Sequence, residues 1–338
     1  MKVTYNWLKE FVEIKISPQA LAEKLTMAGL EVTALEEKAG DFVFEIEITS
    51  NRPDWLSVTG IAREVAVILG KKLKIPGVKK QQKSRAGHLP FAIKVENKKD
   101  CPLYTAKIIK DVKVRSSPDW LRKRLELIGC RSINNIVDIS NYILFTWGEP
   151  LHAFDLDKLN GNIIFVRRAK RGEKIITIDA EQRMLNPDIL VIADEAGPVA
   201  VAGVMGSKDT EVTEATKNIL LEAAAFNPIV VRRGRRNLGI QSESSYRFER
   251  GVNLEIIDNA SWQAAELIQE LTGGRCVLAK SSGLTRTKRK SITLELSAAN
   301  KILGINIPAS KIKKILNKLE FKTRIKTKNH FSVKIPGH

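Results

Sequence analysis

Hydrophobic and polar positions over the first seventy residues follow two different periods. Residues 17–29 begin with Ser-Pro, place apolar side chains at helical spacing and end at a glycine, which predicts a short capped helix. Residues 44–49 alternate apolar and polar side chains, as a half-buried strand does. An apolar stripe over residues 56–69 then predicts a helix that ends before Gly70. We therefore expect a small α+β unit over residues 1–70.

The pattern becomes richer in strands from residue 91 onward. Runs of β-branched and aromatic residues predict strands at residues 91–95, 104–114, 163–167, 174–178, 189–193 and 199–204. Apolar side chains at helical spacing predict helices near residues 118–128, 133–144, 227–238 and 255–272. We therefore expect one large mixed α/β domain over residues 91–280.

Residues 71–90 separate these two units. They contain seven Lys or Arg side chains and no acidic residue, and they include Pro76, Gly77, Gly87 and Pro90. Such a composition predicts a basic linker.

A third pattern covers residues 290–338. It predicts a strand, two helices and two further strands at residues 292–296, 298–303, 308–319, 321–326 and 331–335. This order resembles a small helix-pair-plus-sheet nucleic-acid-binding module. Because the sequence stops directly after the last strand, we expect the module to be truncated and the chain to be the N-terminal piece of a longer protein. The predicted fold class is α+β multidomain.

Composition and length fit this division. The 338 residues are 43% hydrophobic and 28% charged, which excludes a disordered or collagen-like chain. The sequence has neither the ~18-residue apolar run of a membrane span nor a signal peptide after Met1. We therefore expect a cytoplasmic protein that does not act at a membrane.

Cysteine and histidine usage gives no sign of a metal. Cys101, Cys130 and Cys276 stand far apart, and the four histidines show no ligand spacing around them. The sequence supports neither a disulfide framework nor a zinc site, and we expect no metal site in this chain.

The charge is localised. The chain has 56 Lys and Arg against 38 Asp and Glu, a net +18, and two segments hold this excess. One is the predicted linker, and the other is residues 281–338, with fourteen basic and two acidic side chains. Concentrated positive charge favours RNA as a partner over an anionic membrane. A lysine-rich solvated surface explains the same pattern.

Two glycines invite comparison with a phosphate-binding loop. Gly203 and Gly206 do not satisfy the spacing of that motif, because Val201 and Ser207 stand where glycine and lysine are required. No dinucleotide-binding glycine pattern follows a strand either. The two glycines therefore allow close backbone approach, either for tight packing or to present amides to a small ligand.

Two titratable residues and one basic run are candidates for function. Glu222 lies inside an otherwise apolar run, where burial without a partner is costly, although an edge strand would expose it harmlessly. His152 follows Pro150, and a lone histidine of this kind is more often structural. The basic run of Arg232, Arg233, Arg235 and Arg236 is suited to phosphate contact or to internal salt bridges.

Six strings in the same order along the chain carry a resemblance to a known family. They are NRPDWLS at 51–57, GIARE at 60–64, NIVDISNY at 135–142, PLHAFD at 150–155, AGVMG at 202–206 and YRFERGV at 246–252. With these motifs the sequence resembles the beta chain of bacterial phenylalanyl-tRNA synthetase, also called phenylalanine–tRNA ligase, from its first residue to its last.

The resemblance also shows two departures. Residues 36–41 join directly the two flanks of an oligonucleotide-binding-fold insertion that bacterial members usually have. The family's catalytic-like core, magnesium-site acids and anticodon-contacting module would all follow residue 338. The resemblance implies ATP and Mg²⁺ as cofactors of the whole enzyme, with their sites outside this chain. We therefore do not expect this chain alone to charge tRNA.

For residues 91–280 the resemblance implies an editing domain that hydrolyses tyrosine wrongly attached to phenylalanine tRNA without a cofactor. The residues carried over to its pocket are Ser140, Asn141, His152, the backbone of Ala202 and Gly203, Glu222, Ser242 and Ser244. Among them Ser140, Asn141, His152 and Glu222 would be catalytic. Glu222 would recognise the tyrosine hydroxyl, because a buried carboxylate rejects an analogue that leaves it unpaired.

Details of this chemistry stay open at the level of sequence. His152 would orient a water or the terminal ribose, and participation by the tRNA's own ribose hydroxyl is equally compatible. Ser244 stands where the family usually has alanine, and Ser207 where a second glycine is usual.

The expected partners are an alpha subunit, in an alpha2-beta2 tetramer, and phenylalanine tRNA, with phosphate contacts from the Arg232–Arg236 run. The leading hypothesis is an aminoacyl-tRNA synthetase subunit with editing esterase activity. Its rivals are a non-catalytic tRNA-docking and assembly subunit and a free-standing trans-editing hydrolase.

Overall fold

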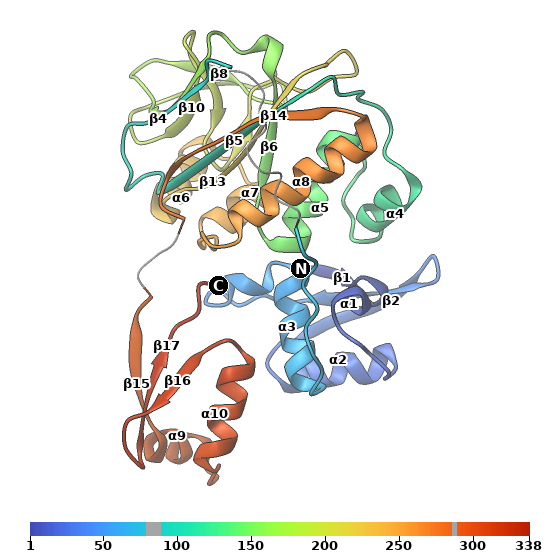
Figure 1. The fold of residues 1–338 in the computed structure, drawn as a ribbon, viewed down its shortest axis with the longest axis vertical. Helices are drawn as coiled ribbons and strands as arrows, with labels where there is room; N and C mark the ends of the chain where they lie inside the picture. Colours follow the sequence, from blue (N-terminus) through green and yellow to red (C-terminus); the bar gives the residue numbers. More distant parts are fainter. Residues whose placement is uncertain (79–88, 286–288) are drawn as a thin grey trace.

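The structure, a computed structural model, describes residues 1–78, 89–285 and 289–338. Figure 1 shows a central domain above two smaller units, one formed by the N-terminal residues and the other by the C-terminal residues. Four basic residues of the predicted linker, Lys79, Lys80, Lys83 and Arg85, lie outside the described residues.

The N-terminal unit is a small sheet covered by helices. Its elements are β1 (Lys2–Thr4), α1 (Tyr5–Phe11), α2 (Pro18–Met27), β2 (Val32–Lys38), β3 (Asp41–Ile46), the 3-10 turn η1 (Pro53–Trp55) and α3 (Val58–Ile68). The strands are ordered β1-β3-β2. The Ser17 hydroxyl caps α2 as predicted, since it accepts the N–H of Ala20 at 3.2 Å. The strand predicted at 44–49 is wrong by three residues, because a turn closed by Arg52 N–H on the Thr49 carbonyl follows β3.

The central domain packs two sheets face to face and covers one of them with helices. Its strands are β4 (Ala92–Val95), β5 (Leu103–Lys110), β6 (Leu151–Asp155), β7 (Ile163–Arg168), β8 (Lys174–Ile176), β9 (Gln182–Met184), β10 (Leu190–Ala193), β11 (Pro198–Val201), β12 (Met205–Gly206), β13 (Ile219–Ala225) and β14 (Arg275–Gly283). Its helices are α4 (Asp119–Leu127), α5 (Asn135–Trp147), the 3-10 turn η2 (Leu156–Lys158), α6 (Pro228–Leu238), α7 (Glu243–Phe248) and α8 (Ile257–Thr272).

Strand order explains why both faces of β13 are apolar. Among the described residues one sheet is ordered β14-β5-β13-β6 and the facing one β12-β11-β10-β7-β4. Leu221 and Ala223 of β13 belong to the core shared with α5 and α8, while Leu220 and Ala224 belong to the core between the two sheets. Alternate residues of one strand therefore serve two cores, which is typical of a strand covered on both faces.

Three of the strands predicted in the central domain end earlier than expected. The strand predicted at 174–178 stops at Ile176, and the other two ends have a backbone cause. The strand predicted at 104–114 stops at Lys110, because Asp111 adopts a left-handed conformation with φ of 60°. The strand predicted at 199–204 stops at Val201, because a turn in which Gly203 has φ of 69° follows β11 and precedes β12.

The C-terminal module has the predicted order of elements. They are β15 (Ser291–Glu295), α9 (Leu296–Leu303), α10 (Ala309–Lys318), β16 (Lys322–Ile325) and β17 (His330–Lys334), with the strands ordered β15-β17-β16. Among the described residues its interior has three buried side chains, Leu296, Phe331 and Val333, and five partly buried ones pack against them: Leu294, Ala309, Ile312, Leu316 and Phe321.

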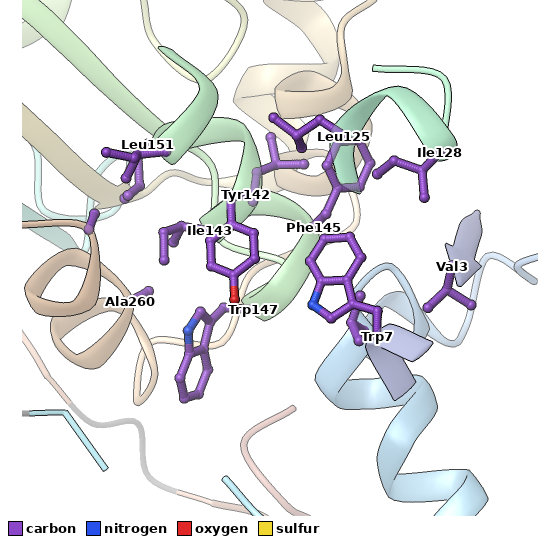
Figure 2. Close-up of a cluster of buried hydrophobic side chains, with 14 of the residues drawn as sticks. Val3, Trp7, Leu125, Ile128, Tyr142, Ile143, Phe145, Trp147, Leu151 and Ala260 are labelled. Carbon is purple, nitrogen blue, oxygen red and sulfur yellow. The ribbon is translucent and has the colours of Figure 1, made fainter. Parts of the chain in front are cut away.

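The hydrophobic core does not stop at residue 70. One cluster of buried side chains contains residues of α1 and α3 together with residues of α4, α5 and α8. Trp7 stacks on Tyr142 of α5, with ring centroids 5.5 Å apart and planes 6° from parallel. Figure 2 shows both residues in this cluster with Phe145 and Leu125. The N-terminal unit and the central domain are therefore joined by interior packing.

We expect Trp7→Ala to destabilise both units together. Trp7 is fully buried, so truncation should cost about 3–5 kcal/mol of unfolding free energy, as removing a buried tryptophan typically does. Urea unfolding followed by segment-resolved amide exchange measures the change in residues 1–70 and in α5. Trp120→Ala is the matched control: Trp120 also contacts Tyr142 but is 43% exposed, so about 1 kcal/mol or less is expected. Destabilisation confined to residues 1–70 would contradict a shared core.

Candidate functional site

A cavity opens where β6, β13, the turn between β11 and β12, and α7 meet. It is lined by Pro150, Leu151, His152, Ile192, Ala200, Val201, Ala202, Gly203, Val204, Met205, Gly206, Glu222, Ser244 and Phe248. Five residues proposed from the sequence are thus brought together from separate parts of the chain: His152, Ala202, Gly203, Glu222 and Ser244.

Glu222 supplies the carboxyl of this cavity. Its strand β13 has neighbours on both sides, with Ala106 opposite Glu222 on β5 and His152 opposite it on β6, so Glu222 does not lie on an edge strand. The side chain is 7% exposed, and the phenol of Tyr104 donates a hydrogen bond of 2.8 Å to its Oε2. Burial raises the pKa of Glu222 to about 7, although the Tyr104 hydrogen bond opposes that rise.

His152 is held as a neutral ring beside this carboxyl. Burial lowers its pKa to about 4, and its Nε2 atom is buried without a hydrogen-bond partner among the described residues. The ring meets Phe154 edge to face, with centroids 4.5 Å apart. A neutral imidazole with an unpaired nitrogen can accept a proton or a hydrogen bond from a bound molecule.

The turn at Ala202–Gly206 forms another wall, and its glycines are required by close neighbours. A Cβ on Gly203 would lie 2.9 Å from the Phe248 ring, and one on Gly206 would lie 2.5 Å from Nε2 of His152. The N–H of Ala202 already donates to the Leu190 carbonyl at 3.0 Å. This leaves the amide of Gly203 as the candidate donor to a ligand.

Helix α7 places the serines predicted for the pocket. Ser242 caps the helix: its hydroxyl accepts the Ser245 N–H at 3.1 Å and donates to the Val204 carbonyl at 2.8 Å. Ser244 lies in the first turn and lines the cavity. Ser242 therefore fastens the helix to the glycine turn instead of lining the cavity itself.

Ser140 and Asn141 were also predicted for the site from the sequence. Both belong to α5, and neither is among the residues that line the cavity. Ser140 is buried, and its hydroxyl donates to the carbonyl of Ile136 at 3.1 Å, one turn earlier in the helix. The structure thus gives Ser140 a local hydrogen bond, and the assignment of both residues to the site stays a prediction.

The sequence allows the four arginines of α6 either to contact phosphate or to form internal salt bridges, and the structure divides them between these two roles. Arg235 is half-buried and forms a salt bridge with Glu249, with Nε and Oε2 2.8 Å apart. Arg232, Arg233 and Arg236 are exposed. Only the exposed three are free to contact a phosphate without breaking a salt bridge.

Sequence reasoning missed Tyr104, the partner of the buried carboxyl. It lies 118 residues before Glu222, and only the register of β5 against β13 makes the two side chains neighbours. It also missed Glu149, a fully buried carboxyl two residues before β6, and burial raises the pKa of this group well above its ordinary value. The apolar neighbours of Glu222 gave a signal for its burial, but nothing near residue 104 gave one for its partner.

Neither a metal centre nor a membrane span is found in the described residues. No group of three or more His, Cys, Asp and Glu side chains is placed there to hold an ion. The described ranges thus offer no carboxylate cluster to the Mg²⁺ expected for a whole ligase. No helix of these ranges is long and apolar enough to cross a membrane.

Comparison with domain families defines the class of protein. The model of the B3/4 domain matches residues 100–273, more than half of the chain. The model of the tRNA synthetase B5 domain matches residues 292–338. The chain is therefore a B3/4-domain protein that also has a B5 domain.

Similar proteins define the family more narrowly. The beta subunit of phenylalanine–tRNA ligase from Carboxydothermus hydrogenoformans is 44% identical over 301 residues, which cover 88% of this chain and 37% of that protein. The corresponding subunit from Rhodopirellula baltica is 40% identical over 324 residues, covering 94% of this chain and 47% of that one. The chain belongs to the phenylalanine–tRNA ligase beta-subunit family, and it spans less than half the length of these relatives.

A solved structure shows the same fold. The crystal structure of an N-terminal fragment of the phenylalanyl-tRNA synthetase beta-subunit from Pyrococcus horikoshii matches with a TM-score of 0.51. It covers 100% of this chain and 93% of that one at 17% sequence identity. The mixed multidomain fold expected from the sequence is thus confirmed.

We expect Glu222→Gln to remove part of the pH dependence of stability. With a pKa raised from about 4.5 to about 7, the wild-type carboxyl is neutral in the fold at pH 5 but must be buried as a charge above pH 7. The wild type should therefore lose up to roughly 3 kcal/mol of unfolding free energy, relative to Gln, as pH rises from 5 to 8.

Urea unfolding of both proteins at several pH values measures this difference. His152 is present in both proteins, and burial alone shifts its pKa, so its titration cancels. The charge of Glu222 also raises the pKa of the buried Glu149, so the difference between the two proteins includes this coupling. Parallel curves for the two proteins would show that burial does not raise the pKa of Glu222.

We expect Gly206→Ala to force His152 out of its position. The new Cβ would overlap the imidazole, so the unfolding free energy should fall by about 1–3 kcal/mol, as for other overpacked sites. A shift of the His152 ring resonances in NMR would report the displacement. Gly197→Ala is the matched control, since a Cβ there has no neighbour within 4 Å. Equal effects of the two substitutions would contradict the close approach.

Proposed function

We propose that the cavity at Glu222 and His152 is an editing site that hydrolyses tyrosine wrongly attached to phenylalanine tRNA. Membership of the beta-subunit family supports the class of substrate, and the cavity supports the reaction. The observation that carries the proposal is the buried carboxyl of Glu222, which faces the cavity in a sheet interior where a carboxyl is otherwise costly.

Glu222 accounts for selectivity between two amino acids that differ by one hydroxyl. The tyrosine phenol donates a hydrogen bond to the carboxyl, which compensates for part of its desolvation. Phenylalanine has no such donor and would leave the buried group without that bond. Sites built to bind a hydroxyl can reject the analogue lacking it by large factors, whereas an apolar pocket cannot strongly reject an added hydroxyl. An editing site of this kind therefore complements a synthetic site that admits some tyrosine.

Hydrolysis requires a water and a donor to the developing oxyanion. The water oxygen attacks the ester carbonyl carbon, the bond to the ribose oxygen breaks, and the ribose oxygen takes a proton as tyrosine leaves. The Gly203 amide is the candidate oxyanion donor. His152 accepts the hydrogen of the water or of a ribose hydroxyl through its unpaired nitrogen, and its neutral state at pH 7 allows either role.

The wider function follows from the family. In this proposal the chain acts in the cytoplasm as part of a phenylalanine–tRNA ligase beta subunit. An alpha subunit completes the alpha2-beta2 enzyme, which uses ATP and Mg²⁺ to charge phenylalanine tRNA. The exposed arginines of α6, Arg232, Arg233 and Arg236, contact tRNA phosphates, while Arg235 keeps its salt bridge to Glu249.

The test is deacylation of phenylalanine tRNA carrying either tyrosine or phenylalanine. We expect the purified chain to release tyrosine and to spare phenylalanine, and Glu222→Ala to lower tyrosine release at least about 100-fold. His152→Ala should lower it as well, with the tyrosine preference retained. Glu214→Ala, which removes an exposed carboxyl of the same domain, is the matched control and should leave the rate unchanged.

Measurements at low and moderate salt separate weak tRNA capture from an inactive site, because phosphate contacts weaken as salt rises. A folded chain that binds the tRNA at low salt but releases no tyrosine would sink the proposal. That result would favour a docking and assembly role instead.

A further inference from the structure

One face of helix α7 contacts the N-terminal unit. The guanidinium of Arg247 is 2% exposed, and its Nε donates to the carbonyl of Leu56 at 3.1 Å. Its Nη2 lies 3.8 Å from the sulfur of Met1. Its Nη1 donates to the carbonyl and the carboxylate of Glu243 within α7. A buried guanidinium with this set of partners fixes the position of the helix against residues of the N-terminal unit.

The other face of α7 contacts the cavity. Ser244 and Phe248 line it, and Phe248 packs against Phe226 with ring centroids 5.0 Å apart. The capping residue, Ser242, holds the Val204 carbonyl of the glycine turn at 2.8 Å. A six-residue helix therefore connects the Leu56 carbonyl on one side with two cavity walls on the other.

The same turn of the N-terminal unit meets a second element of the site. Gly148 ends α5 with φ of 75°, and a Cβ there would lie 3.2 Å from Cβ of Ser57 and 3.7 Å from the Leu56 carbonyl oxygen. Four residues later the chain reaches His152. The Leu56–Ser57 turn thus touches both the helix that carries Ser244 and the segment that leads into β6.

We propose that Arg247 is a positioning residue, and that through it the N-terminal unit sets the geometry of the cavity. This proposal rests on the proposed editing function only where kcat for tyrosine release is measured. A lysine at this position keeps the charge, but all of its donors lie on one terminal nitrogen, so it has no donor where the Nε of Arg247 meets the Leu56 carbonyl. Loss of the Leu56 bond releases α7, and the released helix no longer holds Ser244, Phe248 and the glycine turn in place.

The experiment uses the full chain with Arg247→Lys and, as control, Arg250→Lys. Arg250 follows in the same segment, but its Nη1 donates to the Tyr246 carbonyl and to Glu249, both in the central domain. For Arg247→Lys we expect amide exchange to quicken at residues 243–248 and 202–206 but not in β10 or α8. We expect kcat for tyrosine release to fall about tenfold or more, as small misplacements of reacting groups do. KM for the charged tRNA should stay within twofold.

Other results for Arg247→Lys would assign Arg247 a different role. Faster amide exchange throughout the central domain of Arg247→Lys would show that Arg247 only stabilises the fold. If exchange at residues 202–206 and kcat were both unchanged, Arg247 would only join the two units. Equal effects of Arg247→Lys and Arg250→Lys would also overturn the proposal. If the wild type releases no tyrosine, the editing function fails, but the exchange pattern still tests whether Arg247 positions the cavity walls.

Discussion

Burial of one carboxyl constrains the whole central domain. Glu222 lies on a strand with neighbours on both sides, faces the gap between two sheets and is 7% exposed, so most of its hydration is lost. Such a group persists in a stable fold only with a hydrogen-bond donor nearby or in its protonated form, and here both are available. Tyr104 donates from the neighbouring strand, and burial raises the pKa. These strands thus place a polar group in the lining of the cavity, between sheets whose other facing side chains are mostly apolar.

The sequence predicted the elements better than the site. Capping residues and apolar stripes are local, so α2, α4, α6 and α8 lie within two residues of their predicted bounds. Strand ends depended on backbone conformations such as that of Asp111, which no periodicity reveals. The edge strand β14 was missed altogether, because its residues do not alternate in burial. An edge strand is held by backbone hydrogen bonds to one neighbouring strand. These bonds do not require a particular alternation of apolar and polar side chains, so the sequence pattern does not reveal them.

Site residues could be predicted from the sequence where the residues next to them gave a signal. Glu222 stood out because it interrupts an apolar run, and the glycines because they allow close approach. The resemblance named Ser140 and Asn141 as well, but they lie on α5 and are not among the residues that line the cavity, and their assignment to the site stays a prediction. Tyr104 and Arg247 depend on strand register and on packing between units. Contacts between residues more than a hundred positions apart are a property of the fold and not of any local segment.

The approach of Gly206 to His152 has an evolutionary consequence. Because a Cβ at position 206 would occupy the space of the imidazole, any larger residue there is compatible only with a smaller or displaced side chain at position 152. The constraint runs in one direction: a side chain at position 206 requires a change at position 152, whereas a smaller residue at 152 leaves the glycine undisturbed. The imidazole can therefore be lost in one step, but the glycine cannot be replaced until the ring has moved or gone.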